Sequence, residues 1–455
     1  MKKQVIIISV VAVALLGCLL SLLHNFKTPD ESMSPPSLSG EDKKIEEAFR
    51  GSIKTRDYTL EYPSEGANRT AFVKANLDGD PQEEVIVFYT LKSQENSVRI
   101  NILDSKDGKW HSLLDEDGYG SQIDSVEFDD LNGDGVPEIL FVWSTFDSGN
   151  TRVLTVHSAH EHDSSMTLTT LVNEPLSFMK TADMDNDGID EILTVTSSSS
   201  SHKANATANL LKMNSSGTIK PYGSSVSLDG NVSSYAALNI QKSGDHAVAL
   251  LDAYKGSSSM ITEAILWNAN LNFLEAPFTN EDTLANTKTL RSTPVPSMDI
   301  DGDGEYEIPI EVDTGSDTQP AESEDSIPTT RIPQTCWSDV VVNSMGAITL
   351  VPKAYSYVNT ADRYMFNVSQ SLRSNVSVYR SESTGVVTVY GSYNSIVQGD
   401  PMFSLVIKPA GSLGDSDTYS FKKQYGSKVI YGTITSAGQK LGFTDELIEN
   451  SIVFY

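Results

Sequence analysis

The sequence predicts a mainly β protein: a β-propeller of at least five four-stranded repeats, followed by a small C-terminal α+β domain. Three observations predict this class. A loop pattern recurs at regular spacing, a short apolar run follows each loop, and the residues after 359 carry eight acidic and eight basic side chains whereas the rest of the chain is strongly acidic.

The repeat is defined by four segments that align without gaps and start at Asn76, Asp130, Asp183 and Asp299. The starts are 54, 53 and 116 residues apart. Oxygen-bearing side chains recur at positions 1, 3, 5 and 9, and Gly stands at position 6 in three copies. The last interval spans about two periods, and we expect a degenerate copy without the carboxylates to start near Asn239 within it. Repeats of this length with several short strands are typical of propellers.

The strand pattern is the same in each copy. The apolar run directly after each loop has no polar face, as expected for a strand near the middle of stacked blades, whereas the outer runs alternate. These patterns assign residues 42–358 to the propeller, with a polar insertion at 314–335. Alternating segments in 359–455, and Thr444 as the cap of a short helix, favour a separate α+β domain; two further divergent blades are the alternative.

The composition narrows the classes of partner. The chain has 61 acidic and 33 basic residues, for a formal net charge of −28, which argues against nucleic acid as a ligand. Its two cysteines, Cys18 and Cys336, exclude a disulfide framework. We interpret Cys336 as a small buried side chain rather than a nucleophile, because no His lies near it in the sequence.

The N-terminus predicts export. Residues 1–26 hold Lys2 and Lys3 followed by an apolar run, and a Pro/Ser-rich linker at 27–41 follows. The segment ending in Cys18 resembles a lipobox, which implies acylation of that cysteine. An uncleaved membrane helix and plain secretion are the alternatives. In the first two cases the body of the protein lies on the extracytoplasmic face of the cell membrane.

The loops have the chemistry of calcium sites. Asp and Asn at alternate positions bring hard oxygens toward one centre, and a Gly at position 6 supplies the positive φ that folds the loop. Oxygen ligands without His or Cys favour Ca²⁺. The EF-hand is excluded because its position-12 Glu is replaced by Val87, Phe141, Thr194 and Ile310. The bidentate carboxylate is therefore expected at position 9: Glu84, Glu138, Glu191 or Glu307.

Over roughly residues 66–358 these loops resemble the FG-GAP/VCBS type of calcium-loop β-propeller repeat, which also occurs in integrin α chains. The resemblance implies Ca²⁺ ligands from side chains at positions 1, 3, 5 and 9 and from the carbonyl at position 7. In the first copy, Asn76 replaces Asp and Pro81 occupies position 6, so this copy departs most from the pattern. The implied ligands are Asp130, Asn132, Asp134, Val136 and Glu138; Asp183, Asp185, Asp187, Ile189 and Glu191; Asp299, Asp301, Asp303, Glu305 and Glu307; and Asn76, Asp78, Asp80 and Glu84.

Other readings of the sequence remain open. The loops can be solvated acidic turns without a metal, and His157, His160 and His162 can form a zinc site or stay exposed. Because no catalytic motif is present, we expect a non-enzymatic binding or scaffold module for a protein or glycan partner. A propeller enzyme acting on polysaccharide and a purely structural envelope component are the alternatives.

Overall fold

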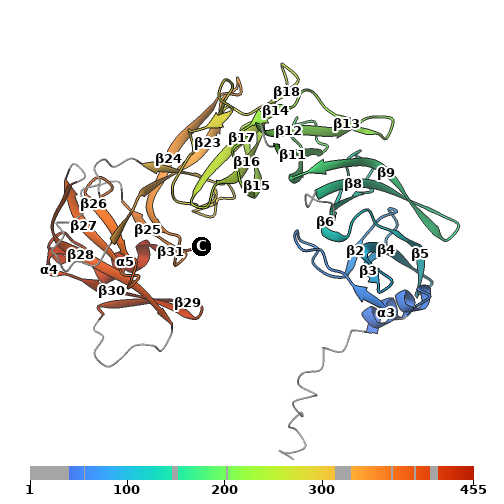
Figure 1. Ribbon diagram of the computed structural model, residues 1–455, viewed down its shortest axis with the longest axis horizontal. Helices are drawn as coiled ribbons and strands as arrows, with labels where there is room; N and C mark the ends of the chain where they lie inside the picture. Colours follow the sequence, from blue (N-terminus) through green and yellow to red (C-terminus); the bar gives the residue numbers. More distant parts are fainter. Residues whose placement is uncertain are drawn as a thin grey trace, which may run out of the picture.

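The computed structural model describes residues 40–55, 57–145, 152–200, 203–312, 329–369, 372–393, 396–409 and 419–455. These residues form a mainly β structure of six larger antiparallel sheets, which follow one another along an arc in sequence order (Figure 1). The export segment, Cys18 and almost all of the 27–41 linker lie outside the described residues. Among the described residues, no helix is long and apolar enough to cross a membrane.

The first sheet begins with a helix that covers one of its faces. Helix α3 (Gly40–Ser52) has Glu41 and Asp42 in its first turn, where they oppose the positive end of the helix dipole, and it buries Ile45 and Phe49. The strands of this sheet are β1 (Tyr58–Leu60), β2 (Phe72–Ala75), β3 (Glu84–Leu91), β4 (Gln94–Lys106) and β5 (Lys109–Asp117).

The next three sheets are each built on four consecutive strands, as the repeat predicts. The fourth contains the degenerate copy, whose first two strands form a hairpin that turns at Gly244 with φ +63°. The second sheet has β6 (Gln122–Asp129), β7 (Glu138–Ser144), β8 (Arg152–His162) and β9 (Ser165–Leu176). The third has β10 (Phe178–Ala182), β11 (Glu191–Ser200), β12 (Lys203–Met213) and β13 (Ile219–Pro221), with β14 (Val226–Leu228) also paired to β12. The fourth has β15 (Ser234–Ser243), β16 (His246–Lys255), β17 (Ser259–Asn268) and β18 (Phe273–Glu275), and the ladder of β19 (Thr279–Asn280) and β20 (Ala285–Asn286) follows it.

The last two sheets exchange strands. The boundary predicted between residues 358 and 359 falls at the end of β24, and the next strand, β25, pairs with β24 in the same sheet. Part of the predicted polar insertion, 329–332, forms a strand of the sixth sheet. The fifth sheet has β21 (Ile308–Val312), β23 (Gln334–Val342), β24 (Ile348–Asn359), β25 (Tyr364–Val368) and β31 (Ile452–Phe454). The sixth has β22 (Thr329–Ile332), β26 (Val376–Ser381), β27 (Val387–Tyr393), β28 (Ile396–Pro409), β29 (Phe421–Tyr425) and β30 (Lys428–Ile434), with helices α4 (Ser436–Lys440) and α5 (Asp445–Ser451) alongside. The side chain of Thr444 caps α5, as predicted.

The hydrophobic cores lie between consecutive sheets, which explains why the strand after each loop is apolar on both faces. Successive side chains of a strand point to opposite faces of its sheet. In β3, Val87 therefore packs toward α3 while Phe88 packs toward the second sheet. In β7, Phe141 packs toward the first sheet and Val142 toward the third.

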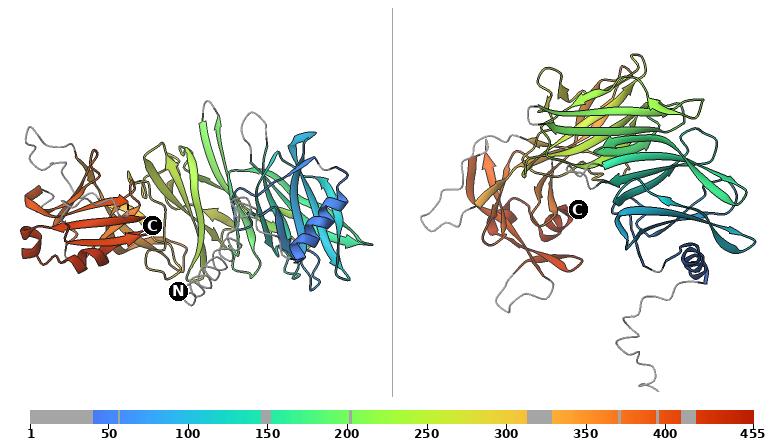
Figure 2. Two further views of the ribbon diagram at one scale, coloured as in Figure 1. Left: turned by 90° about the horizontal axis from the view of Figure 1, so that it is seen from below. Right: turned by 45° about the vertical axis from the view of Figure 1, so that its right-hand side comes forward.

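The arc stays open between the first and the sixth sheets. All views in Figures 1 and 2 place these two sheets at its opposite ends, with α3 on the outer face of the first. The described residues thus form a succession of face-packed sheets, and they do not form a closed ring.

Candidate metal centre

The four predicted loops occupy equivalent places in the first, second, third and fifth sheets. The first three loops lead into inner strands and the fourth leads into β21, at the edge of its sheet. In every copy the Glu at position 9 stands at or next to the start of that strand. Glu84, Glu191 and Glu307 are fully buried, and Glu138 is 2% exposed. Four buried carboxylates therefore face four short acidic loops.

One oxygen of each buried Glu is used to fasten its own loop. The Oε2 atom accepts a hydrogen bond from the backbone N–H at position 2 in all four copies. The N···O distances are 2.6 Å from Leu77, 3.0 Å from Leu131, 2.9 Å from Met184 and 2.9 Å from Ile300. This leaves Oε1 as the oxygen that each Glu can offer to a second partner.

The polar side chains of the loop also hold its backbone. In the second copy, the Asp130 carboxylate accepts from the N–H groups of Gly133 and Gly135 at 2.7 and 2.8 Å, and Asp134 accepts from the Val136 N–H at 2.8 Å. The third and fourth loops repeat this pattern. The N–H groups of Ile189 and Glu305, whose carbonyls are implied ligands, likewise donate to Asp187 and Asp303.

The turn uses two positions with positive φ rather than one. At position 6, Gly135, Gly188 and Gly304 have φ of +89°, +92° and +89°, as predicted. Position 4 is also left-handed, with φ between +63° and +81°, and only Gly and Asn occur there, which is the residue choice that this conformation favours. The residues at position 4 are Gly79, Gly133, Asn186 and Gly302. The first loop therefore keeps one of its two left-handed positions despite Pro81.

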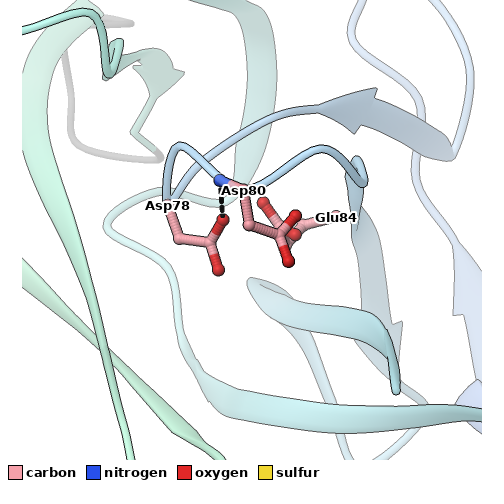
Figure 3. Close-up of side chains that lie close together, drawn as sticks. All are labelled: Asp78, Asp80 and Glu84. Carbon is pink, nitrogen blue, oxygen red and sulfur yellow. Dashed lines mark hydrogen bonds between the residues drawn. The ribbon is translucent and has the colours of Figure 1, made fainter. Parts of the chain in front are cut away.

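The first loop gathers three carboxylates around an unpaired oxygen. Carboxylate oxygens of Asp78, Asp80 and Glu84 lie within 4.8 Å of one another, and Figure 3 shows the three side chains converging. Among the described residues, no group hydrogen-bonds to the buried Glu84 Oε1. Burial, together with the charges of Asp78, Asp104 and Asp80, raises the pKa of Glu84 to about 7, although the hydrogen bond from Leu77 opposes the rise.

A neighbouring sheet adds to this negative field. Glu161, on β8, lies near Asp78, and its pKa is raised by desolvation, by its interaction with Asp78 and by the charge of Asp104. Unpaired buried carboxylate oxygens are costly, and a cation removes that cost by binding to them. The residues of the first loop therefore fit a hard cation.

The second loop satisfies its Glu without a cation. The Asn132 side-chain amide donates to Glu138 Oε1 at 3.1 Å. Burial raises the pKa of Glu138. Burial also opposes the charge on Asp130, but backbone hydrogen bonds from Gly135 and Gly133 bring its pKa below the usual range.

In the third loop the carboxylates surround an ammonium group. Lys212 Nζ, from β12, lies 2.7 Å from both Asp185 and Asp187 and also hydrogen-bonds to Glu191 Oε1. Burial raises the pKa of Glu191 to about 7, whereas the Lys212 hydrogen bond opposes that rise. The same ammonium lowers the pKa of Asp187.

The fourth loop has a lysine as well, from a different strand. Lys353 Nζ, on β24, lies 2.9 Å from Asp301, 2.6 Å from Asp303 and 2.7 Å from Glu307. Asp299, Asp301 and Asp303 come within 4.8 Å of one another in this loop. Carboxylate oxygens of Asp183, Asp185 and Glu191 likewise lie within 4.8 Å of one another in the third loop. In both loops, a lysine ammonium group meets the oxygens that a metal would bind.

Sequence reasoning did not identify these lysines. Lys212 stands one residue beyond the Ile192–Leu211 pair of the β11–β12 ladder, which places it across from Glu191. A search of the third strand of each repeat for a Lys opposite the position-9 Glu would have found it. Lys353 lies within an irregularity in the pairing of β23 with β24, between the paired residues Pro352 and Ala354, and no spacing rule predicts it.

The other candidate residues do not form a site in the described residues. His157 is half-buried against the ring of Phe141, His160 is exposed, and His162 pairs with Asp163 at 3.0 Å. Cys336 is buried, and its Sγ lies 3.5 Å from the Ser338 hydroxyl. The three histidines are not brought together as a metal-binding group.

Comparison with known proteins gives no further assignment. No protein-family model matches the chain, and a search of curated proteins finds no significant match.

Proposed function

We propose that the protein binds Ca²⁺ at its first loop, through Asp78, Asp80 and Glu84, and that the ion holds the loop to the start of β3. The observation that carries this proposal is the buried Glu84 Oε1, which has no hydrogen-bond partner in the described ranges and lies beside two further carboxylates. An all-oxygen donor set selects a hard cation such as Ca²⁺. The ion would supply a positive partner for the Glu84 Oε1 atom, to which no group among the described residues hydrogen-bonds.

The sheets are, in this proposal, the blades of an FG-GAP/VCBS-like propeller acting as a binding or scaffold module for a protein or glycan. Support comes from the four-stranded repeats, from the cores between consecutive sheets and from the recurrence of one loop in four of them. Residues 1–26, with Cys18 as the acylation site, would anchor the module on the extracytoplasmic face of the cell membrane.

Calcium titration of the full-length protein and of Glu84→Gln tests the metal site. We expect Ca²⁺ to bind the wild type and to raise its free energy of unfolding, by about 2.7 kcal/mol at 100 times the dissociation constant. Glu84→Gln should lose this response while remaining no less stable in chelator, because it removes an unpaired buried charge. Isothermal titration and thermal melting measure both effects.

The control is Glu83→Gln, which makes the same change on the adjacent, exposed residue. It should bind calcium like the wild type. A wild-type melting temperature that is the same in calcium and in chelator would overturn the proposed site.

A glycan array combined with hydrolase and lyase assays on the same polymers tests the binding module. We expect calcium-dependent retention of a glycan or protein ligand without turnover, because the sequence holds no recognised catalytic motif. Turnover of any polymer would replace the binding module with the polysaccharide-acting enzyme.

A further inference from the structure

The third and fourth loops contain a cation that belongs to the chain. In the third loop, Lys212 reaches in from β12, and its side chain is only 17% exposed. Its Nζ also lies 5.1 Å from the centre of the Tyr222 ring, which is stacked on Trp267. The aromatic ring helps to keep the ammonium at the carboxylates, because its face attracts cations.

In the fourth loop a lysine also meets the carboxylates, but it comes from a different place in its sheet. Lys353 lies on β24, which is separated from β21 by β23, whereas Lys212 lies on β12, which pairs directly with β11. Its Nζ meets Asp301, Asp303 and Glu307, with Asp339 at 3.4 Å. Two lysines at unrelated positions thus bring Nζ to the position-9 Glu of their loops.

The match between ammonium and loop is chemical as well as spatial. A lysine ammonium has three N–H donors, and each of these two meets three carboxylates. The oxygens it meets include those at positions 3, 5 and 9, which are the side chains that a calcium ion would need. An ammonium and a metal ion cannot hold the same oxygens together.

In the first sheet, an acidic residue takes the place of the lysine. The residue one step beyond the Val85–Leu103 pair is Asp104, so a carboxylate stands where the third sheet has Lys212. Asp104 is 8% exposed and raises the negative charge around Glu84. The residue across from the position-9 Glu therefore differs in sign between the two sheets.

We propose that Lys212 and Lys353 are internal replacements for the metal ion, which close the third and fourth loops to calcium and stabilise them without it. This inference rests on the proposed calcium chemistry of the loops. It goes further in assigning the loops to two kinds: a first loop that depends on an external cation, and two loops whose cation is supplied by the chain.

Lys212→Met and Lys353→Met, made separately in the full-length protein, test the inference. Methionine keeps an unbranched side chain of similar length and removes the charge and the donors. In chelator each variant should melt below the wild type, and in calcium it should recover. In isothermal titration each should bind one more Ca²⁺ than the wild type.

Lys255→Met is the matched control. Lys255 is 21% exposed and pairs with the buried Asp229 at 2.6 Å, outside the four loops. The Lys255→Met variant should be less stable than the wild type both in chelator and in calcium. It should bind the same number of Ca²⁺ ions as the wild type. Equal calcium stoichiometry in the wild type, Lys212→Met and Lys353→Met would overturn the inference while leaving the first-loop site intact. No binding to the wild type, with one ion bound by Lys212→Met, would overturn the first-loop site alone.

A measurement on the wild type avoids the risk that a variant does not fold. Reductive methylation followed by peptide mass spectrometry should modify Lys212 and Lys353 slowly, at the same rate with and without calcium. Faster modification of either lysine on adding calcium would show that the metal displaces the ammonium, which contradicts the inference.

Discussion

The buried glutamates at position 9 show how one residue type is satisfied in different ways at equivalent places. Each fixes its loop through Oε2. Within the part of the chain that the structure describes, Oε1 meets no partner in Glu84, an amide in Glu138 and a lysine in Glu191 and Glu307. The position of the glutamate at the start of a strand was predictable from the loop spacing. Its partner was not, because Lys212 and Lys353 come 21 and 46 residues later and reach it only through strand pairing.

His157 is expected to make stability depend on pH between 6.5 and 4. Burial lowers its pKa from the ordinary 6.5 to about 4, so the unfolded chain takes up a proton at higher pH than the folded protein. Above pH 6.5 both states are neutral at this residue. Between 6.5 and 4 the free energy of unfolding should fall on account of His157, by roughly 2 kcal/mol once the 1.36 kcal/mol per pKa unit is reduced for the solvent screening of a half-buried ring.

Urea unfolding of the wild type and of His157→Gln at pH 7.5 and pH 4.5 isolates this effect from that of the carboxyl groups. The loss on acidification should be smaller in the variant. His160→Gln, at an exposed histidine of the same strand, should behave as the wild type does. An equal loss in the wild type and in His157→Gln would show that His157 is not involved.

At the scale of elements, most strands were predictable, because each either is apolar on both faces or alternates apolar and polar residues. β22 was the exception: its four residues lie within a polar, Pro-containing stretch, and only pairing with β26 makes them a strand. Helix α3 comes from a short stretch that buries Ile45 and Phe49. Its role was not predictable, because the sequence does not show which face of which sheet it covers.

Phe49→Ala tests that role. Phe49 is fully buried, with edge-to-face contacts to Tyr58, Phe72 and Tyr89 at centroid distances of 5.4, 6.1 and 5.2 Å. We expect the first sheet to lose about 3 kcal/mol or more of stability, because the ring leaves a cavity. Denaturant unfolding measures the loss. Glu47→Ala, at an exposed residue of the same helix, should change stability by less than about 0.5 kcal/mol. A similar small change in Phe49→Ala would mean that α3 is not part of the folded core.

At the scale of the whole molecule, the sequence predicts the order of the sheets but not the open arc. A ring of sheets closes only when the free face of the first packs against the last. In this structure α3 covers that face through Phe49 and β3. The repeat spacing describes how each sheet meets the next, and it holds no information about the two ends.

The exchange of strands between the last two sheets has a consequence for the continuity of the chain. β22 lies between β21 and β23 in the sequence but pairs with β26 of the sixth sheet. β31, near the C-terminus, pairs with β25 of the fifth sheet. No single cut between Ile308 and Phe454 yields two fragments that each keep a whole sheet. These two sheets can be lost, duplicated or transplanted only together, whereas each of the second, third and fourth sheets occupies one uninterrupted stretch of sequence.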